Sequence, residues 1–533
     1  MSDESTEKTV SHKSGHKHHK DRAAEIANTF EWLITAFILA FVFRAFVMEA
    51  FRIPTGSMAD TLKGAHFRLR CRQCGYEYEH GYNPPKADTI PLNGASLDQT
   101  QCPNCGYLPL EGQIVPVANG DRILVLKCIY QFFEPKRWDV IVFKNPLDPQ
   151  INYIKRLVGL PKETVEIIDG DVYIDGQIAR KPPKVQNEQW MPVYDNDYQP
   201  IRPGDQSFSQ DYPRKWRQRF NTSDSKWQIA AERPTVFKLE SEPDETQVME
   251  YDSLDDTDFR ATYAYDPVFE YRHLPYCSDL MVRSYVRAEG AQGRIGISLS
   301  KYGIRYSGSV DFDGNMVIAT GPEEAETVLI SRSIGSPAIV EGQTKLIKFA
   351  NVDHELVLEF GQEKLIHDLG RDVEDAGEID ENVEPGVGIF GAGKLELLHT
   401  AVFRDIHYTR YKYAQSHQTG KATEGRPFEL EKDQFFVLGD NSPNSQDSRW
   451  WERPGTGNSG LQYREGIVPR DYLVGKALFV YWPSGFKPFD RFPFAAIPNV
   501  GKMRFIYGGA NGYNGSHDGV TTVADGNTPV GAD

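Results

Sequence analysis

A single apolar run near the N-terminus constrains this chain more than any other feature. The run covers residues 30–48, and only Glu31, Thr35 and Arg44 within it are polar or charged. As an α-helix at about 1.5 Å per residue it is about 28 Å long, which is enough to cross the hydrocarbon core of a bilayer. We therefore expect a transmembrane helix over residues 29–51.

The residues before this run indicate its orientation. Residues 1–28 are polar and include a cluster of His, Lys and Arg side chains. We interpret them as a disordered cytoplasmic tail; metal binding by the histidines is the alternative. Basic residues before the helix place the N-terminus in the cytoplasm and the remainder of the chain outside the cytoplasmic (inner) membrane, as a single-pass protein. A cleavable secretory signal is the rival interpretation, but no small-x-small site follows the run closely.

The composition of the remaining chain favours a folded, strand-rich protein. Aromatic residues make up 12% of the 533 residues, and there are 46 Gly and 33 Pro. Aromatic side chains favour strands, while Gly and Pro favour turns. The formal net charge of −16 argues against a general nucleic-acid binder, which would present a basic surface.

Three short segments carry residues suited to chemistry. Taken singly, each has an ordinary interpretation: a turn, a strand whose lysine reaches solvent, and a loop rich in local hydrogen bonds. The segments are Pro54-Thr55-Gly56-Ser57-Met58-Ala59-Asp60-Thr61-Leu62, Tyr153-Ile154-Lys155-Arg156-Leu157-Val158-Gly159-Leu160-Pro161 and Gly439-Asp440-Asn441-Ser442-Pro443-Asn444-Ser445-Gln446-Asp447-Ser448-Arg449.

Lys155 is the most informative residue of the second segment. In a strand it shares a face with Tyr153 and Leu157, which is an apolar setting for an amine. Two interpretations follow. The amine either extends to solvent, or it is desolvated; in the second case its pKa falls and the neutral amine becomes available as a base.

Together, and in this order after a membrane helix, the three segments resemble bacterial type I signal (leader) peptidases, a family of membrane-anchored Ser/Lys proteases. The resemblance covers residues 29–70, 115–183 and 426–490. It implies that Ser57 is the nucleophile and Lys155 the general base.

The resemblance also implies supporting roles for four further residues. Ser445 would orient the Lys155 amine. Thr55 stands where the family has a serine whose hydroxyl, together with the backbone N–H of the nucleophile, forms the oxyanion hole. Asp447 and Arg449 would be a structural pair beneath the site.

What the resemblance implies for function is removal of signal peptides from exported precursors at small-x-small sites, without a catalytic cofactor. The partners would be those precursors and the lipid bilayer. The sequence departs from the family pattern at Asp60, where the family usually has Pro, and at Ser442, where a basic residue is common. An inactive scaffold that binds glycan or protein is therefore the alternative. A self-cleaving Ser/Lys regulator is a third interpretation, and the preceding membrane helix argues against it.

Four cysteines form two Cys-x-x-Cys-Gly knuckles, at Cys71 and Cys74 and at Cys102 and Cys105. Four thiolates at this spacing suit a tetrahedral structural zinc. We predict a zinc-ribbon-like insert over residues 71–114. Disulfides are the rival interpretation, because this part of the chain is expected outside the cytoplasm.

Residues 184–425 lie outside the family pattern and contain recurrent short alternating runs, which favour a β-sandwich. These runs diffusely resemble concanavalin-like jelly rolls; binding of glycan or protein and a structural insert are both open interpretations. The peptidase core is then assigned to 52–70, 115–183 and 426–505, with a disordered tail at 506–533. The predicted fold is mainly β: an N-terminal transmembrane helix, a signal-peptidase β-fold catalytic core, a zinc-ribbon insert and a β-sandwich (jelly-roll) insert.

Overall fold

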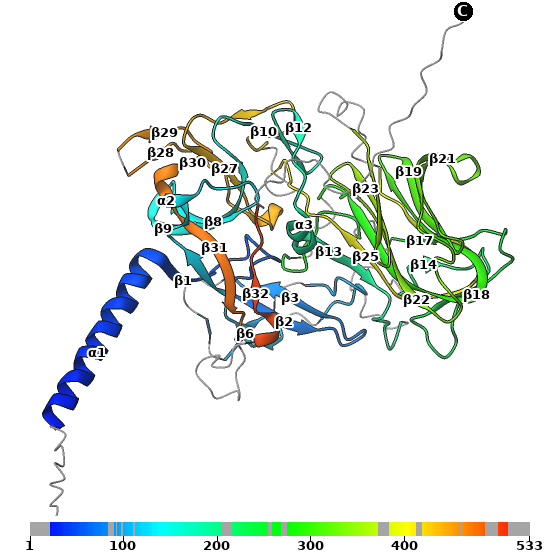
Figure 1. Ribbon diagram of the computed structural model, residues 1–533, viewed down its shortest axis with the longest axis horizontal. Coiled ribbons are helices and arrows are strands. Elements are labelled where there is room, and N and C mark those ends of the chain that lie inside the picture. Colours follow the sequence, from blue (N-terminus) through cyan, green and yellow to red (C-terminus); the bar gives the residue numbers. More distant parts are fainter. Residues whose placement is uncertain are drawn as a thin grey trace, which may run out of the picture. The chain divides into compact units, whose positions relative to one another are not determined.

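The computed structural model describes most of the chain (Figure 1). The predicted tails at 1–28 and 506–533 fall largely outside the described residues. The described residues are 22–83, 90–91, 93–97, 100–109, 112–203, 216–253, 258–267, 274–370, 383–411, 418–458, 460–485 and 499–509.

The N-terminal unit is a helix without buried residues. It consists of α1 (Arg22–Val42) followed by the π-helical turn η1 (Phe43–Val47). Within Glu25–Val47 an 18-residue window has a mean hydropathy of 1.9, and the whole stretch is about 35 Å long at 1.5 Å per residue. An apolar helix long enough to span a membrane is thus confirmed, but its bounds differ from the predicted 29–51. The helix starts earlier and ends at Val47, because β1 (Met48–Arg52) takes up extended backbone from Met48 onwards.

An eight-stranded sheet, called the core sheet below, organises the second unit. Its strand order is β1-β7-β31-β8-β9-β27-β30, with β32 beside β31. Every residue of β8 except one is buried, as expected of a Val/Ile/Phe-rich central strand. The further bounds are β7 (Arg122–Leu126), β8 (Val140–Asn145), β9 (Asp148–Gly159), β27 (Gln434–Leu438), β30 (Val468–Pro469), β31 (Leu473–Trp482) and β32 (Arg504–Phe505).

Smaller sheets and short helices surround the core sheet. A four-stranded sheet has the order β12-β11-β10-β26, and the turn between β10 and β11 places Asp169 and Gly170 at positive φ, as a tight hairpin requires. The elements are β10 (Thr164–Ile168), β11 (Asp171–Ile174), β12 (Gln177–Ile178), β26 (Phe428–Glu429), β28 (Gly455–Thr456), β29 (Gln462–Tyr463), α2 (Ile129–Phe132), α3 (Pro183–Gln189), η6 (Ser442–Asn444), η7 (Arg470–Tyr472) and η8 (Val500–Lys502).

The cysteine knuckles sit on two small hairpins. The first hairpin is β2 (His66–Arg70) with β3 (Glu77–Gly81), and β6 (Val117–Ala118) also pairs with β2. The second is β4 (Ala95–Ser96) with β5 (Ile114–Val115). Each knuckle therefore lies in a connection that a hairpin closes.

The long insertion, residues 184–425, forms one thirteen-stranded sheet that folds over its own core. The long strands β18 and β25 pair along their length, with a register shift between Ala288 and Gly293. Before the shift β18 pairs with β22, and after it β18 pairs with β19. Apolar residues of both halves, such as Val282 and Ile295, share one core cluster.

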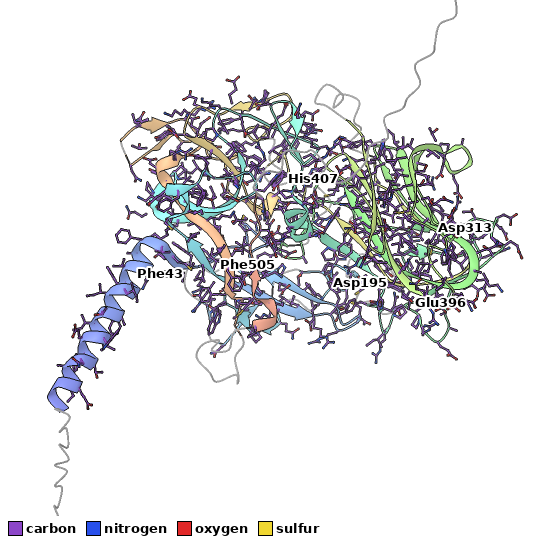
Figure 2. All side chains as sticks on the ribbon, in the orientation of Figure 1. Phe43, Asp195, Asp313, Glu396, His407 and Phe505 are labelled. Atoms are coloured by element: carbon purple, nitrogen blue, oxygen red, sulfur yellow. The ribbon has the colours of Figure 1, made fainter. Side chains whose placement is uncertain are left out.

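Figure 1 shows β18, β19 and β22 in green, and Figure 2 places Asp313 and Glu396 on the right of the view, with His407 nearer its centre, just after β25. The mainly β fold predicted from the sequence is confirmed. The strands are β13 (Met191–Asp195), β14 (Phe220–Asn221), β15 (Trp227–Ile229), β16 (Phe237–Glu240), β17 (Gln247–Tyr251), β18 (Leu280–Lys301), β19 (Ile304–Asp311), β20 (Asn315–Thr320), β21 (Thr327–Ser333), β22 (Thr344–Val352), β23 (Glu355–Phe360), β24 (Glu363–Asp368) and β25 (Val387–Arg404), with the short helix η4 (Glu323–Ala325).

Candidate active site

Ser57 lies in a turn that the backbone holds on both sides. The Ala59 N–H donates to the Gly56 carbonyl at 2.9 Å, and the Leu62 N–H donates to the Met58 carbonyl at 2.7 Å. Gly56 is required because a Cβ there would lie 2.1 Å from the Tyr265 ring. The serine hydroxyl is thereby carried on a closed turn of fixed backbone.

Lys155 reaches this turn from the middle of the core sheet. It lies on β9, opposite Ile141 of β8, and the side chain is only 3% exposed. Its amine lies 2.7 Å from Ser57 Oγ and donates a second hydrogen bond of 3.0 Å to the Ile154 carbonyl. Two residues that lie 98 positions apart in the sequence are thus within hydrogen-bond distance, as a serine nucleophile and its base must be.

Burial controls the charge state of the Lys155 amine. Desolvation lowers the pKa of Lys155 to about 8, although the carboxylates of Asp447 and Asp440 act in the opposite direction. A buried amine loses hydration mainly in its charged form, so the neutral form gains. The second of the two interpretations drawn from the sequence, a desolvated lysine, therefore fits the structure.

The loop after β27 fixes the Ser57 main chain. The Asn441 N–H donates to the Ser57 carbonyl at 3.1 Å. Gly439 sits where a Cβ would lie 2.5 Å from that carbonyl oxygen and 2.1 Å from Ser445 Oγ. Its N–H donates to Asp447 Oδ2 at 3.0 Å. A glycine is therefore needed for this loop to approach the serine turn.

Asp447 and Arg449 form the buried pair that the resemblance implied. Arg449 Nε and Nη2 donate to the two carboxylate oxygens at 2.9 and 2.7 Å, and both side chains are essentially unexposed. Arg449 Nη1 also donates to Ser442 Oγ at 2.7 Å. The serine found in place of a basic residue thus serves as an acceptor for this arginine.

A second buried pair, Arg156 with Asp440, was not predicted. Arg156 Nε and Nη2 donate to the Asp440 carboxylate at 2.8 and 2.6 Å. This bidentate contact joins β9, directly after Lys155, to the loop after β27. The adjacent Lys-Arg and Gly-Asp pairs were visible in the sequence, but no local spacing signals a contact between residues 284 positions apart.

Two of the predicted supporting residues, Ser445 and Thr55, lie in different surroundings. The Ser445 hydroxyl is buried and has no hydrogen-bond partner among the residues that the structure describes. The Thr55 side chain is exposed. Orientation of Lys155 by Ser445, and oxyanion stabilisation by Thr55, remain predictions.

The four knuckle cysteines converge. Cys71 Sγ lies 3.6 Å from Cys105 Sγ, and Cys74 Sγ lies 3.7 Å from Cys102 Sγ; all four sulfurs lie within 4.8 Å of one another. A disulfide needs about 2.05 Å, whereas tetrahedral zinc with bonds of about 2.3 Å places its sulfurs about 3.8 Å apart. The donor set therefore fits a structural metal.

The two knuckles also have the same backbone geometry. The Gly75 N–H donates to the Cys71 carbonyl and the Gly106 N–H to the Cys102 carbonyl, both at 2.9 Å. Both glycines have positive φ, 77° and 78°. Such repeated turns direct two cysteines of each knuckle to one point.

Comparison with known proteins agrees with this geometry. A family model described as signal peptidase, peptidase S26, matches residues 115–226 and 387–482. Over these two segments the chain is similar to signal peptidases of the S26 family. Lys155, Ser445, Asp447 and Arg449 lie inside the matched segments, whereas Ser57 lies outside them.

Individual relatives of the S26 domain have the same description. A signal peptidase I of Rickettsia canadensis is 29% identical over 153 residues, which cover 28% of this chain and 44% of that protein. One of Pseudomonas aeruginosa is 29% identical over 142 residues, covering 26% and 35% of the two chains. The chain thus spans less than half the length of these relatives.

Two solved structures have a weaker likeness. The carbohydrate-binding module CBM66 from Bacillus subtilis has a TM-score of 0.23 at 11% identity, covering 35% of this chain and 95% of that chain. The galectin LEC-6 of Caenorhabditis elegans has a TM-score of 0.18 at 12% identity, covering 24% and 87%. Likeness of this degree leaves the ligand of the long insertion open.

Proposed function

We propose that this protein is a membrane-anchored serine endopeptidase that removes signal peptides from exported precursors, with Ser57 as nucleophile and Lys155 as base. The observation that carries the proposal is the 2.7 Å contact between a desolvated lysine amine and a serine hydroxyl. Two unrelated structural roles would not require a buried amine to lie against a half-buried serine hydroxyl on a turn that a second loop holds. The S26 domain supports the substrate class.

In the proposed reaction, the neutral Lys155 amine accepts the Ser57 proton while Oγ attacks the scissile carbonyl carbon. The resulting ammonium returns the proton to the leaving amine, and an acyl-enzyme remains on Ser57. Water then attacks the ester carbonyl carbon while Lys155 takes its proton; the bond between the acyl carbon and Ser57 Oγ breaks, the Lys155 ammonium returns the proton to Oγ, and the acyl part leaves as a carboxylic acid. The Ser57 backbone N–H and the Thr55 hydroxyl are the proposed donors to the oxyanion.

The apolar helix supplies a reason for the choice of substrate. Signal peptides end in a small-x-small site that lies close to the membrane surface. We propose that the stretch Glu25–Val47 spans the cytoplasmic membrane with its N-terminus inside. A tethered S26 domain on the outer side would then meet the scissile bond without a search through solution.

Cleavage of a precursor with a small-x-small site, in detergent, tests this function. The native chain should cleave at that site, and Ser57→Ala and Lys155→Ala should not. Lys432→Ala is the matched control, because Lys432 is an exposed lysine; it should keep native activity. A folded native chain that leaves the precursor intact would reject the proposal and favour the inactive scaffold.

We also propose that the four cysteines hold one structural zinc, which would fix the two knuckles to each other. Metal analysis of the purified chain should then give one zinc per molecule, and Cys74→Ser should lose it and melt at a lower temperature. Zinc-free protein with two disulfides by mass spectrometry would contradict this assignment.

A further inference from the structure

One segment of the long insertion reaches into the active-site support. The segment 261–266 lies in a part of the chain, 227–386, that the S26 family model does not match. Nevertheless Tyr263 and Tyr265 belong to the same apolar cluster as Phe436 and Leu438 of β27. The segment is therefore packed with the strand that leads into the loop after β27.

Three side chains of this segment contact the Ser57 turn or the loop after β27 that holds it. The Tyr263 hydroxyl donates to the Asp440 carbonyl at 2.8 Å. The Tyr265 ring closes over Gly56, which precedes the nucleophile. Both tyrosines are less than 5% exposed, so these contacts are shielded from water.

Asp266 makes the most direct of these connections. Its Oδ1 accepts from Asn441 Nδ2 at 2.9 Å and from Asn444 Nδ2 at 3.0 Å. The side chain is 5% exposed. One buried carboxylate oxygen thus holds two residues of the loop after β27, and charge strengthens both hydrogen bonds.

Asn441 connects Asp266 to the main chain of Ser57. Its side chain is held by Asp266, while its backbone N–H donates to the Ser57 carbonyl at 3.1 Å. Motion of Asn441 would displace the turn on which Oγ is carried. The contact between Ser57 and Lys155 then depends on a residue outside the matched family segments.

We propose that Asp266 is a positioning residue: through Asn441 and Asn444 it holds the Ser57 turn at the distance from Lys155 that proton transfer requires. The proposal rests on the proposed peptidase function for its kinetic consequence. It makes the long insertion a part of the active-site support and not a separate appended module.

Three variants in the full-length protein test this role. Asp266→Ala should lower kcat by about 10- to 100-fold with little change in KM, because the contact acts on the geometry of the reacting atoms. Asp266→Asn retains an acceptor oxygen and should recover part of this loss. Asp311→Asn is the matched control, since Asp311 also accepts from an asparagine, Asn315, within the same insertion.

A second readout separates positioning from mere stabilisation and does not need turnover. The pH dependence with which a small amine-acylating reagent labels Lys155, followed by mass spectrometry, reports the pKa of that amine. In Asp266→Ala this pKa should rise towards the ordinary lysine value, because a loosened turn admits water. Asp311→Asn should leave it unchanged.

The outcomes are distinguishable. Failure of the native chain to cleave would reject the peptidase function, while the labelling would still decide the role of Asp266. Unchanged labelling of Lys155 in folded Asp266→Ala would overturn the positioning role. An equal loss of kcat in Asp311→Asn would do the same.

Discussion

Buried lysines occur in two different settings in this molecule. Lys155 lies beneath the Ser57 turn, and within the described part of the chain no carboxylate forms an ion pair with it. Lys301, at the end of β18, is equally buried but forms ion pairs with Asp279 and, at 3.8 Å, with Asp171. The pKa of Lys155 is lowered, and that of Lys301 is raised well above its ordinary value.

Lys181 repeats the second setting. It forms ion pairs with Asp353 and, at 2.9 Å, with Asp405, and its pKa is also raised well above the ordinary value. Desolvation is the largest single influence on all three lysines. Burial alone therefore does not make a base. The deciding difference is whether carboxylates contact the amine directly or act only from a distance.

Substitution of lysine by arginine should abolish most of the activity at position 155 and leave it near native at position 301. Arginine keeps the positive charge but does not give up its proton, so it cannot act as a base. Lys155→Arg should lower kcat/KM by about 10⁴-fold or more, the scale on which loss of a catalytic base acts. Lys301→Arg can still form its ion pairs and should cleave at a near-native rate. Comparable values of kcat/KM for these two variants would contradict the assignment of Lys155, and not Lys301, as the base.

Replacement by methionine should lower the stability of the fold much more at position 301 than at position 155. Lys301→Met leaves Asp279 and Asp171 buried without their cation, which costs about 3–5 kcal/mol. Lys155→Met removes a desolvated amine without contacting carboxylates, so stability at pH 7 should stay within about 1 kcal/mol of the native chain. Denaturation midpoints of the two variants in the same detergent give the comparison. A larger loss for Lys155→Met would show that the Lys155 amine stabilises the fold.

The pH dependence of kcat/KM should report the titration of Lys155 and not that of Lys301. Below pH 8 the Lys155 amine is protonated and cannot accept the Ser57 proton; above its pKa of about 8 it is neutral. The value of kcat/KM should therefore rise about tenfold per pH unit up to about pH 8 and then level off. Lys301→Arg should follow the same curve. A profile that is flat from pH 6 to 9 would mean that Lys155 is not the base.

Features of the site that depend on short sequence motifs could be predicted from the sequence, whereas contacts between distant segments could not. Strand alternation placed Lys155 on an apolar face and left open whether its amine reaches solvent or is desolvated. The resemblance of the three segments to signal peptidases implied that it is the base and linked it to Ser57. The Cys-x-x-Cys-Gly spacing likewise predicted four converging sulfurs. In each of these cases the signal lies in short motifs that can be recognised from their own residues.

Contacts between distant segments carried no such signal. Arg156 and Asp440 are 284 positions apart, and Tyr263 and Asp440 are 177 apart. Asp266 lies in an insertion that the family pattern does not describe, so neither periodicity nor resemblance indicated that it holds Asn441. The apolar helix ends at Val47, before the expected end at 51, because the start of β1 at Met48 is set by strand pairing and not by hydropathy.

The prediction with the smallest expected effect concerns the influence of the Asp447 carboxylate on the pKa of Lys155. The Asp447 carboxylate is the largest influence that raises the pKa of Lys155, and the Arg449 guanidinium opposes it. Asp447→Asn removes the negative charge and leaves the positive one, so the pKa of Lys155 should fall. The rising limb of the pH profile should then move to lower pH by less than about one unit, because the charge acts without direct contact.

Asp433→Asn is the control for this shift. Asp433 is an exposed carboxylate paired with Arg470 and is not among the groups that act on Lys155, so its loss should leave the profile in place. Asp447→Asn also leaves Arg449 buried without its partner, and profiles must be recorded below the melting temperature of the variant. A shift to higher pH would mean that loosening of the loop and hydration of Lys155 outweigh the lost charge, and would place Asp447 with Asp266 among the positioning residues.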